Sequence, residues 1–140
     1  MASLVAFLPE HLSALALQPA QEGTADVMDE AYALGLAAGG PAWTLFGRDG
    51  RPLACGGLYG VWTGRAIAWA LLSPLAPMVA VTRAARVMLG GSGVRRVECF
   101  VDVDFPQGHR WATMLGFRPE GVMRAFCPRG RDHTLYARID

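Results

Sequence analysis

The stretch that most constrains the fold runs from Gly108 to Phe117 and has the sequence GHRWATMLGF. It follows the apolar run at residues 97–103 and precedes two further runs that are typical of a β-hairpin. Gly116 can end a helix, because glycine adopts the left-handed backbone conformation of helix C-termini without strain. The sequence therefore predicts a short helix near residues 108–115, set between a buried strand and a C-terminal hairpin, with Phe117 in the core.

The first third of the chain predicts one strand and two helices. Residues 3–7 form a short apolar run, and Pro9 suits the first position of a helix, where its missing N–H has little effect. A second helix is expected over residues 25–37, ended by Gly39-Gly40-Pro41. The residues expected to point inward from these two helices are Leu12, Leu15, Ala16, Val27, Ala31 and Leu34.

The centre of the chain changes to the period of β-strands. Apolar runs at residues 43–46, 53–59 and 66–72 are separated by turn residues, which predicts an antiparallel three-stranded meander. Gly56 and Gly57 lie within the second run. Two kinds of explanation are open for them: a bulge or a close backbone approach, or packing against a bulky neighbour.

The helical period returns after Pro77, with one face made by Val81, Ala84, Ala85, Met88 and Leu89. A strand is expected over residues 94–103 and, after the short helix, two more near residues 121–127 and 134–139. The order of elements is β-α-α-β-β-β-α-β-α-β-β. We therefore expect a mixed α/β (α+β) fold in which residues 1–140 form a single domain.

The composition fits one globular domain. A chain of 140 residues with 52% hydrophobic content is large enough to bury a sizeable core. Its longest apolar stretch, at residues 66–72, is far shorter than the roughly 20 residues that span a bilayer. The N-terminus carries no basic leader. We therefore expect no membrane association and a cytoplasmic protein.

The cysteines, histidines and charges limit the classes of function. Cys55, Cys99 and Cys127 are odd in number and lie among apolar neighbours, which favours reduced core thiols over disulfides. The histidines form no ligand pair, so no metal site is expected. The net charge of +1 divides into −3 over residues 1–82 and +4 over residues 83–140. This excess is too small for nucleic-acid binding, and two interpretations stay open: solvated arginines, or contact with the phosphates of a nucleotide cofactor.

Several segments, in this order and spacing, resemble one known family. They are Trp43-Thr44-Leu45-Phe46, Asp49-Gly50-Arg51-Pro52-Leu53-Ala54, Ala68-Trp69-Ala70-Leu71-Leu72-Ser73, Val101-Asp102-Val103-Asp104, Arg110-Trp111 and Leu115-Gly116-Phe117. Together they resemble the N-acetyltransferases of the GNAT superfamily, and most closely the small GNAT-like proteins of bacteriophages and prophages. The resemblance covers nearly the whole chain. It implies a single-domain GNAT fold, whose mostly antiparallel central sheet splays between its fourth and fifth strands.

The resemblance also implies acetyl-CoA (CoA) as the cofactor. It would be held by the backbone of the fourth strand and by the N-terminus of the following helix, where amide N–H groups attract phosphates. In this chain the cofactor-binding residues would be Leu71, Leu72, Ser73, Val79, Ala80, Val81, Thr82, Arg83 and Arg86. The loop between strand and helix departs from the family pattern. It has no glycine, and Pro74 and Pro77 each remove an amide donor.

Ala112 occupies the position at which many GNAT enzymes place a tyrosine as general acid. His109 and Asp104 flank the loop before the last helix and are the candidate catalytic residues, because an imidazole changes charge near neutral pH. The alternatives are a capping role for His109 and, for Asp102 and Asp104, either binding of a cationic substrate or hydrogen bonds that hold the loop. His133 is interpreted as a turn residue.

These features predict an N-acyltransferase that moves an acetyl group from acetyl-CoA to an amine by direct attack. The acceptor amine belongs to a small molecule or a protein, and a homodimer is compatible with the resemblance. The alternative is a non-catalytic GNAT-like phage protein, virion-associated or a host-interaction module, whose cofactor loop has degenerated. For a phage-encoded enzyme the expected location is the cytoplasm of the host cell.

Overall fold

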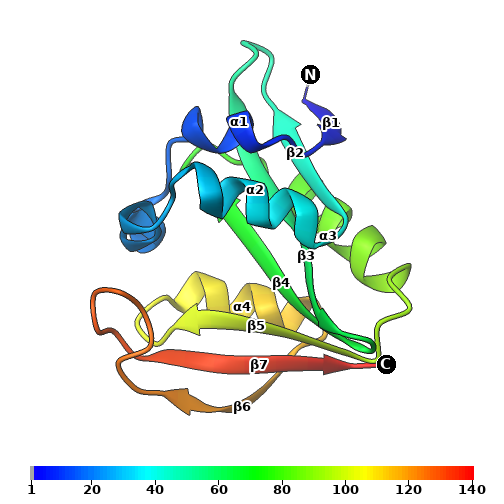
Figure 1. The fold of residues 1–140 in the computed structure, drawn as a ribbon, viewed down its shortest axis with the longest axis vertical. Helices are drawn as coiled ribbons and strands as arrows, with labels where there is room; N and C mark the ends of the chain where they lie inside the picture. The colour runs from blue at the N-terminus through cyan, green and yellow to red at the C-terminus, as the bar shows by residue number, and fades with distance from the viewer. Residues whose placement is uncertain (1) are drawn as a thin grey trace.

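The computed structural model describes residues 2–140, which form one seven-stranded sheet with helices packed on it (Figure 1). In chain order the elements are β1 (Ser3–Ala6), α1 (Pro9–Ser13), the 3₁₀-helix η1 (Pro19–Asp26), α2 (Glu30–Gly39), β2 (Ala42–Phe46), β3 (Pro52–Trp62), β4 (Arg65–Leu72), α3 (Met78–Gly90), β5 (Arg96–Asp102), α4 (Pro106–Met114), β6 (Arg118–Met123) and β7 (His133–Ile139). The other elements confirm the predicted order, and η1 is an additional element that was not predicted. Within residues 2–140, none of the helices has the length and apolar character needed to cross a lipid bilayer.

The sheet has the strand order β1-β2-β3-β4-β5-β7-β6, and its neighbouring strands are antiparallel except for β4 and β5. These two pair over residues 65–67 and 96–98. Beyond this short junction the strands separate, and Figure 1 shows β4 running away from β5 and β7. The predicted splay between the fourth and fifth strands is therefore confirmed, and it divides the sheet into two halves.

A buried carboxylate holds the junction of β4 and β5. Glu98 is 4% exposed and accepts hydrogen bonds from Arg65 Nε (2.7 Å) on β4 and from Arg96 Nε (2.7 Å) on its own strand. The Arg65 hydrogen bond above all, with help from Arg96, lowers the pKa of Glu98 to about 2 against the opposing effect of burial. Because a buried charge without its partner is costly, these ion pairs fix the place where the two halves join.

The second helix differs from its prediction in both its start and its buried face. α2 begins at Glu30, because the Asp29 carboxylate caps it by accepting a hydrogen bond from the Tyr32 N–H (2.8 Å). The residues before it form η1, whose three-residue period places the chain differently, and α2 buries Ala33 and Leu36. The predicted inward positions were wrong for Val27, Ala31, Leu34 and, after α1, Ala16, which are exposed, and right for Leu12 and Leu15.

Gly56 on β3 lies against the indole of Trp43 on the neighbouring β2. A Cβ built on Gly56 would come within 2.6 Å of Trp43 Cζ2. The pairing of β3 with β4 runs through this point without a shift, and its irregularity lies instead between Gly60 and Trp62. Packing against a bulky neighbour therefore accounts for Gly56. Gly57 instead marks a close backbone approach, because a Cβ there would lie 2.7 Å from the carbonyl oxygen of Pro41.

The C-terminal half is built around Phe117, which is 3% exposed and packs with buried residues of β5, α4 and β7. Gly116 precedes it with a φ of 92°, the left-handed conformation expected after the helix. β6 starts at Arg118 rather than at residue 121, because Arg118 already pairs with Ala137 of β7. α3 buries three of the predicted positions, Val81, Ala84 and Leu89, and Leu89 belongs to the same buried cluster as Phe117.

Candidate functional site

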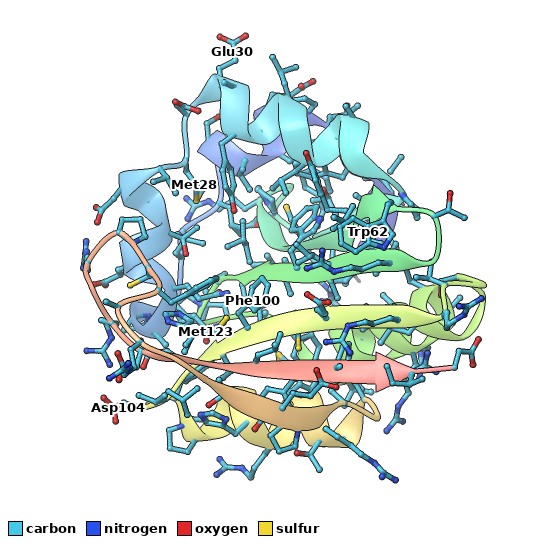
Figure 2. The ribbon with its side chains drawn as sticks, turned by 60° about the horizontal axis from the view of Figure 1, so that its bottom comes forward. Met28, Glu30, Trp62, Phe100, Asp104 and Met123 are labelled. Carbon is cyan, nitrogen blue, oxygen red and sulfur yellow. The ribbon has the colours of Figure 1, made fainter. Side chains whose placement is uncertain are left out.

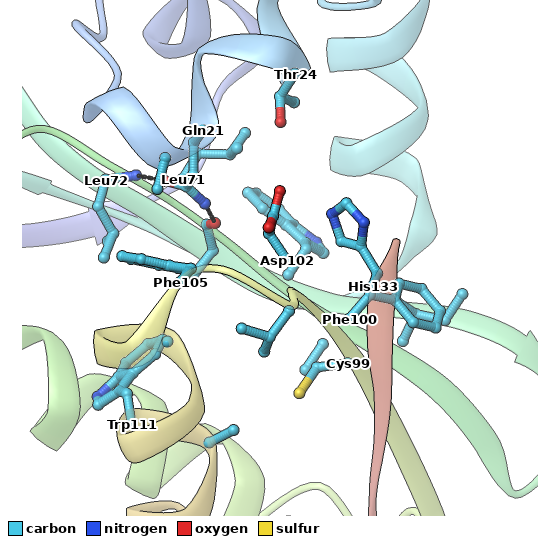
Figure 3. Close-up of a pocket in the computed structure, with 18 of the residues that line it drawn as sticks. Gln21, Thr24, Leu71, Leu72, Cys99, Phe100, Asp102, Phe105, Trp111 and His133 are labelled. Atoms are coloured by element: carbon cyan, nitrogen blue, oxygen red, sulfur yellow. Dashed lines mark hydrogen bonds between the residues drawn. The ribbon is translucent and has the colours of Figure 1, made fainter. Parts of the chain in front are cut away.

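A cavity of about 910 Å³ opens where β4 and β5 separate. One wall comes from β4 and η1, and the other from β5, α4 and the β6–β7 loop. Figure 3 shows residues of both walls facing one another. The lining is mainly apolar and includes the aromatic side chains of Trp43, Trp69, Phe100, Phe105, Trp111 and Phe126. Such a space suits a chemical step that needs water excluded.

Gln21 of η1 occupies the free edge of β4. Its Nε2 donates to the carbonyl oxygen of Ala70 (2.7 Å), and its Oε1 accepts from the Leu72 N–H (2.9 Å), as the dashed lines in Figure 3 show. The carbonyl oxygen of Leu72 accepts from the backbone N–H of Gln18 (2.8 Å). Since successive residues of a strand direct their backbone groups to opposite edges, those of Leu71 face β3. Of the two strand residues predicted to bind the cofactor, Leu72 therefore presents its groups at the free edge and Leu71 does not.

The other end of η1 is tied to the opposite wall. The carboxylate of Asp26 forms an ion pair with Arg129 of the β6–β7 loop (2.8 Å), and the hydrogen bond from Arg129 lowers the pKa of Asp26. Both side chains are about half exposed, so water screens the pair. Figure 2 shows η1 beside this loop at one side of the molecule. η1 thus spans the gap between the two halves of the sheet.

A charged cluster ends the β5 wall. Arg131 Nη2 donates to Asp102 Oδ1 (2.8 Å) and to Asp104 Oδ2 (2.9 Å), and Asp102 also accepts from the backbone N–H of Asp104 (2.9 Å). The Arg131 hydrogen bond above all lowers the pKa of Asp102 to about 2 against the opposing effect of burial. Both carboxylates already have a cationic partner. This arrangement favours the loop-holding alternative over a free site for a cationic substrate.

The structure separates the two C-terminal histidines. The Nε2 of His109 lies 3.0 Å from the carbonyl oxygen of Asp102 and 3.2 Å from that of Val103, so this nitrogen carries the proton, and Nδ1 accepts from the Tyr136 hydroxyl (2.7 Å). Within residues 2–140, His109 is not among the residues that line the cavity, whereas His133 is. His133 is the first residue of β7 rather than a turn residue, and it lies opposite Asp102 (Figure 3).

The cavity wall carries only a methyl group at the position that the resemblance to GNAT enzymes compares with a tyrosine. Ala112 is 3% exposed and lines the cavity from α4. Cys99, on the β5 wall, also lines it, and burial raises the pKa of this thiol to about 12. The Cys99 thiol therefore stays protonated at neutral pH and is a poor nucleophile.

The N-terminus of α3 carries unpaired amide groups. Pro77 precedes the helix and no side chain of residues 2–140 caps it, so the N–H groups of Met78, Val79 and Ala80 have no partner within the helix. The Val81 N–H, by contrast, donates to the carbonyl oxygen of Pro77 (3.0 Å), and its side chain is fully buried. Of the predicted amide donors, Val79 and Ala80 are therefore the ones free to meet an anion.

A second hollow, of about 470 Å³, lies beside these amides and is lined by Met78, Val79, Thr82, Arg83, Arg86, Val87 and Met114. Arg83 and Arg86 are exposed there and bring positive charge. The Thr82 hydroxyl is engaged as the acceptor of Trp111 Nε1 (2.9 Å), and Ser73 Oγ accepts from the Leu75 N–H (3.1 Å). Among Ser73, Thr82 and the two arginines, all predicted to bind the cofactor, the arginines are thus the ones whose polar groups are exposed and accessible to a ligand.

The fold resembles solved structures of acetyltransferases. The ribosomal-protein-S18-alanine N-acetyltransferase from Escherichia coli matches with a TM-score of 0.74 and 18% identity, over 99% of this chain and 94% of that one. An N-acetyltransferase from Staphylococcus aureus Mu50 matches with a TM-score of 0.73 and 13% identity, over 99% and 98%. A GNAT superfamily phosphinothricin acetyltransferase from Sinorhizobium meliloti, solved with acetyl-CoA, matches with a TM-score of 0.68 and 16% identity, over 99% and 88%.

At these identities the likeness establishes the fold, and the fold is that of the GNAT N-acetyltransferases. No protein-family model matches the sequence. No curated protein matches it at the sequence level.

The sequence did not predict the residues that attach η1 to the two walls, nor two residues at the end of the β5 wall. The first group is Gln18, Gln21, Asp26 and Arg129, and the second is Arg131 and His133. η1 buries no residue, so hydrophobic periodicity could not reveal it. A signal did exist in Pro19, since a proline after a loop is typical of the first turn of a helix.

Proposed function

We propose that this protein is an N-acyltransferase that moves an acetyl group from acetyl-CoA to an amine within the cavity between β4 and β5. The observation that carries the proposal is the position of this cavity, which opens where these strands separate in a GNAT fold. The apolar lining would keep bulk water away from a thioester. The Sinorhizobium meliloti phosphinothricin acetyltransferase, which has this fold, binds acetyl-CoA and so supports the choice of donor.

The start of α3 fits the phosphates of this donor. The N–H groups of Val79 and Ala80 are unpaired, and the helix dipole favours negative charge at this end. Arg83 and Arg86 add charged donors from the exposed side of the helix. A backbone N–H on the free edge of β4 would polarise the thioester carbonyl. The chemistry supplied by the donor is an activated acetyl carbon, and the chain supplies its position.

Direct transfer needs one proton to leave the amine. The amine nitrogen bonds to the carbonyl carbon, the carbon–sulfur bond breaks, and the sulfur is protonated as the nitrogen loses a proton. We assign the acceptance of the amine proton to His133, because it lines the cavity beside Asp102. Water protonates the sulfur in this proposal, since Ala112 has no hydroxyl. His109 and Asp104, the candidates from the sequence, act in it through the loop that they hold.

The acceptor is an amine of a small molecule or of a protein. Enzymes with this fold are named for both classes, phosphinothricin in one case and an alanine of ribosomal protein S18 in another. An acceptor screen should therefore contain amino acids, polyamines and peptides with free N-termini.

A binding measurement followed by this screen tests the proposal. We expect calorimetry to detect CoA and acetyl-CoA, and both ligands to raise the melting temperature, because they bind the folded state. We then expect mass spectrometry to detect an acetylated product with at least one amine class. Absence of binding at millimolar donor would contradict the proposal and favour the non-catalytic GNAT-like alternative. Binding without any transfer would favour a CoA-binding module.

The finer parts of the prediction belong to the same proposal. They are a kinship with the GNAT-like proteins of bacteriophages and prophages, a cytoplasmic location, and the assembly of a homodimer. Light scattering would measure the mass in solution, and fractionation of infected cells and virions would test the location.

A further inference from the structure

We infer that Gln21 competes with the pantetheine arm of the donor for the free edge of β4, so that CoA binds only when η1 leaves this edge. This inference rests on the proposed function. Its basis is that three backbone groups of this edge, the carbonyl oxygen of Ala70 and the N–H and carbonyl oxygen of Leu72, are already hydrogen-bonded within the protein, by Gln21 and by the Gln18 N–H. We call residues 18–26 the strap.

The carboxamide of Gln21 imitates an amide of a neighbouring strand. It donates to the carbonyl oxygen of Ala70 (2.7 Å) and accepts from the N–H of Leu72 (2.9 Å), two groups that lie two residues apart on one edge. A pantetheine arm also consists of amide groups joined by short apolar links. The Leu72 N–H has a single hydrogen, so it cannot serve Gln21 and a second acceptor equally well. The two occupants therefore exclude each other at this position.

The strap is built so that it can move. η1 buries no residue, so its departure leaves no cavity in the core. At one end it is held by neutral hydrogen bonds to Leu72 and Ala70, and at the other by the half-exposed ion pair of Asp26 with Arg129. Water or a ligand can replace interactions of both kinds at little net loss. Opening the strap would uncover the edge of β4 from the side of the cavity.

Three variants and two ligands test the inference. Gln21→Met keeps the size of the side chain and removes both hydrogen bonds, Asp26→Asn loosens the other end of the strap, and Glu22→Gln changes an exposed residue of the same helix as a control. The ligands are CoA and 3′-phospho-ADP, which is CoA without its pantetheine arm. Calorimetry gives the Kd of each pair.

We expect Gln21→Met to bind CoA roughly tenfold more tightly than the parent chain, the value of about two neutral hydrogen bonds. Asp26→Asn should also bind CoA more tightly than the parent chain, but by a smaller factor. Glu22→Gln should bind CoA with the affinity of the parent chain. The Kd of 3′-phospho-ADP should be the same for all four proteins, because the described residues that line the hollow beside the α3 amides include none of the strap. The strongest support would be that, of the four proteins, only Gln21→Met binds CoA.

Other outcomes overturn the inference in distinct ways. Equal or weaker CoA binding by a folded Gln21→Met, with CoA bound by the parent, removes the competition and leaves the proposed function standing. An equal gain for CoA and 3′-phospho-ADP would indicate a general loosening of the fold and also rejects it. Absence of CoA binding by every variant overturns the inference and the proposed function together. If Gln21→Met does not fold, the exposed Asp26→Asn decides by the same comparison.

Discussion

The two walls of the cavity are held by different kinds of interaction. The β4 wall is covered by η1 through neutral hydrogen bonds of Gln21, and η1 has no residue in the core. The β5 wall ends in the ion pairs of Arg131 and is backed by Phe117 in a buried cluster. Neutral hydrogen bonds exchange readily with water or another amide, whereas buried contacts do not. The comparison therefore predicts that η1 can leave the β4 wall, whereas the β5 wall stays in place.

In the proposed mechanism the same difference divides the chemistry. Donor binding would fall to β4 and the start of α3, where edges and amides become available to a ligand. Proton transfer would fall to the β5 and β7 side, where His133 lies opposite Asp102. A wall that must admit a long flexible donor benefits from mobility, and a proton acceptor benefits from a fixed position.

The largest expected effect comes from removing the support of the β5 wall. Phe117 is 3% exposed, so Phe117→Ala should lower the free energy of unfolding by about 3–5 kcal/mol, through lost burial and the cavity left behind. Chemical denaturation measures this change. Met114→Ala is the matched control, because Met114 is 56% exposed at the end of α4 and its truncation should be nearly neutral. A melting temperature of Phe117→Ala equal to that of the parent chain would contradict a rigid β5 wall.

Much of the fold could be predicted because, in most of this chain, the buried residues recur with the spacing of their helix or strand. Runs of apolar residues predicted β2 to β4, and Gly116 predicted the end of α4, although β6 starts at Arg118 and not at residue 121 as expected. The N-terminal helices were less predictable. The side chains of Val27, Ala31 and Leu34 have a helical spacing but are exposed, because the cap at Asp29 starts α2 later than the pattern indicates.

Only some features of the candidate site could be predicted from the sequence, for a related reason. The α3 amides follow from a helix start, which local sequence reveals, and so Val79 and Ala80 could be named in advance. The strap depends on contacts between residues about 50 apart, such as Gln21 with Ala70, and a single sequence carries no signal for such a pair. His133 faces the cavity because β7 pairs with β5, a consequence of topology rather than of its neighbours in the chain.

The next effect separates the two histidines. Once an acceptor is known, His133→Gln should reduce kcat by roughly a hundredfold, the lower range for loss of a positioned proton acceptor. His109→Gln should mainly reduce stability, since it disturbs the hydrogen bond with Tyr136. The rate against pH, for both variants, is the measurement, and Asp102 and Arg131 are the charged groups near His133 that enter its interpretation. Parent-like turnover and an unchanged pH profile in His133→Gln would remove this residue from the mechanism.

A smaller effect concerns the β5 wall and the dependence of its stability on pH. The folded-state pKa of Asp102 is lowered to about 2 from its ordinary value of 3.8, so its contribution to stability is present above pH 3.8 and is lost as the pH falls toward 2. Asp102→Asn should therefore lower stability at neutral pH and flatten its decline in this window. Denaturation at a series of pH values tests this, with Asp104→Asn, 78% exposed, as the matched control. An Asp102→Asn variant with the parent's full acid slope would mean that the Arg131 cluster does not hold the β5 wall.

The smallest expected effect tests whether the phosphates of the donor bind outside the cavity, at the start of α3. Arg83 and Arg86 are exposed at the hollow beside the α3 amides, so each should contribute a modest, salt-sensitive attraction to phosphate. We expect Arg83→Ala and Arg86→Ala to weaken CoA binding roughly two- to fivefold at low salt, and less at high salt. Arg51→Ala is the control, because Arg51 is equally charged and exposed but lies in the β2–β3 turn. Titration of 3′-phospho-ADP adds a second readout, since it should lose the same factor as CoA. If neither arginine changes the affinity for either ligand while CoA still binds, the phosphates do not lie at α3, and the division of labour between the two walls must be drawn differently.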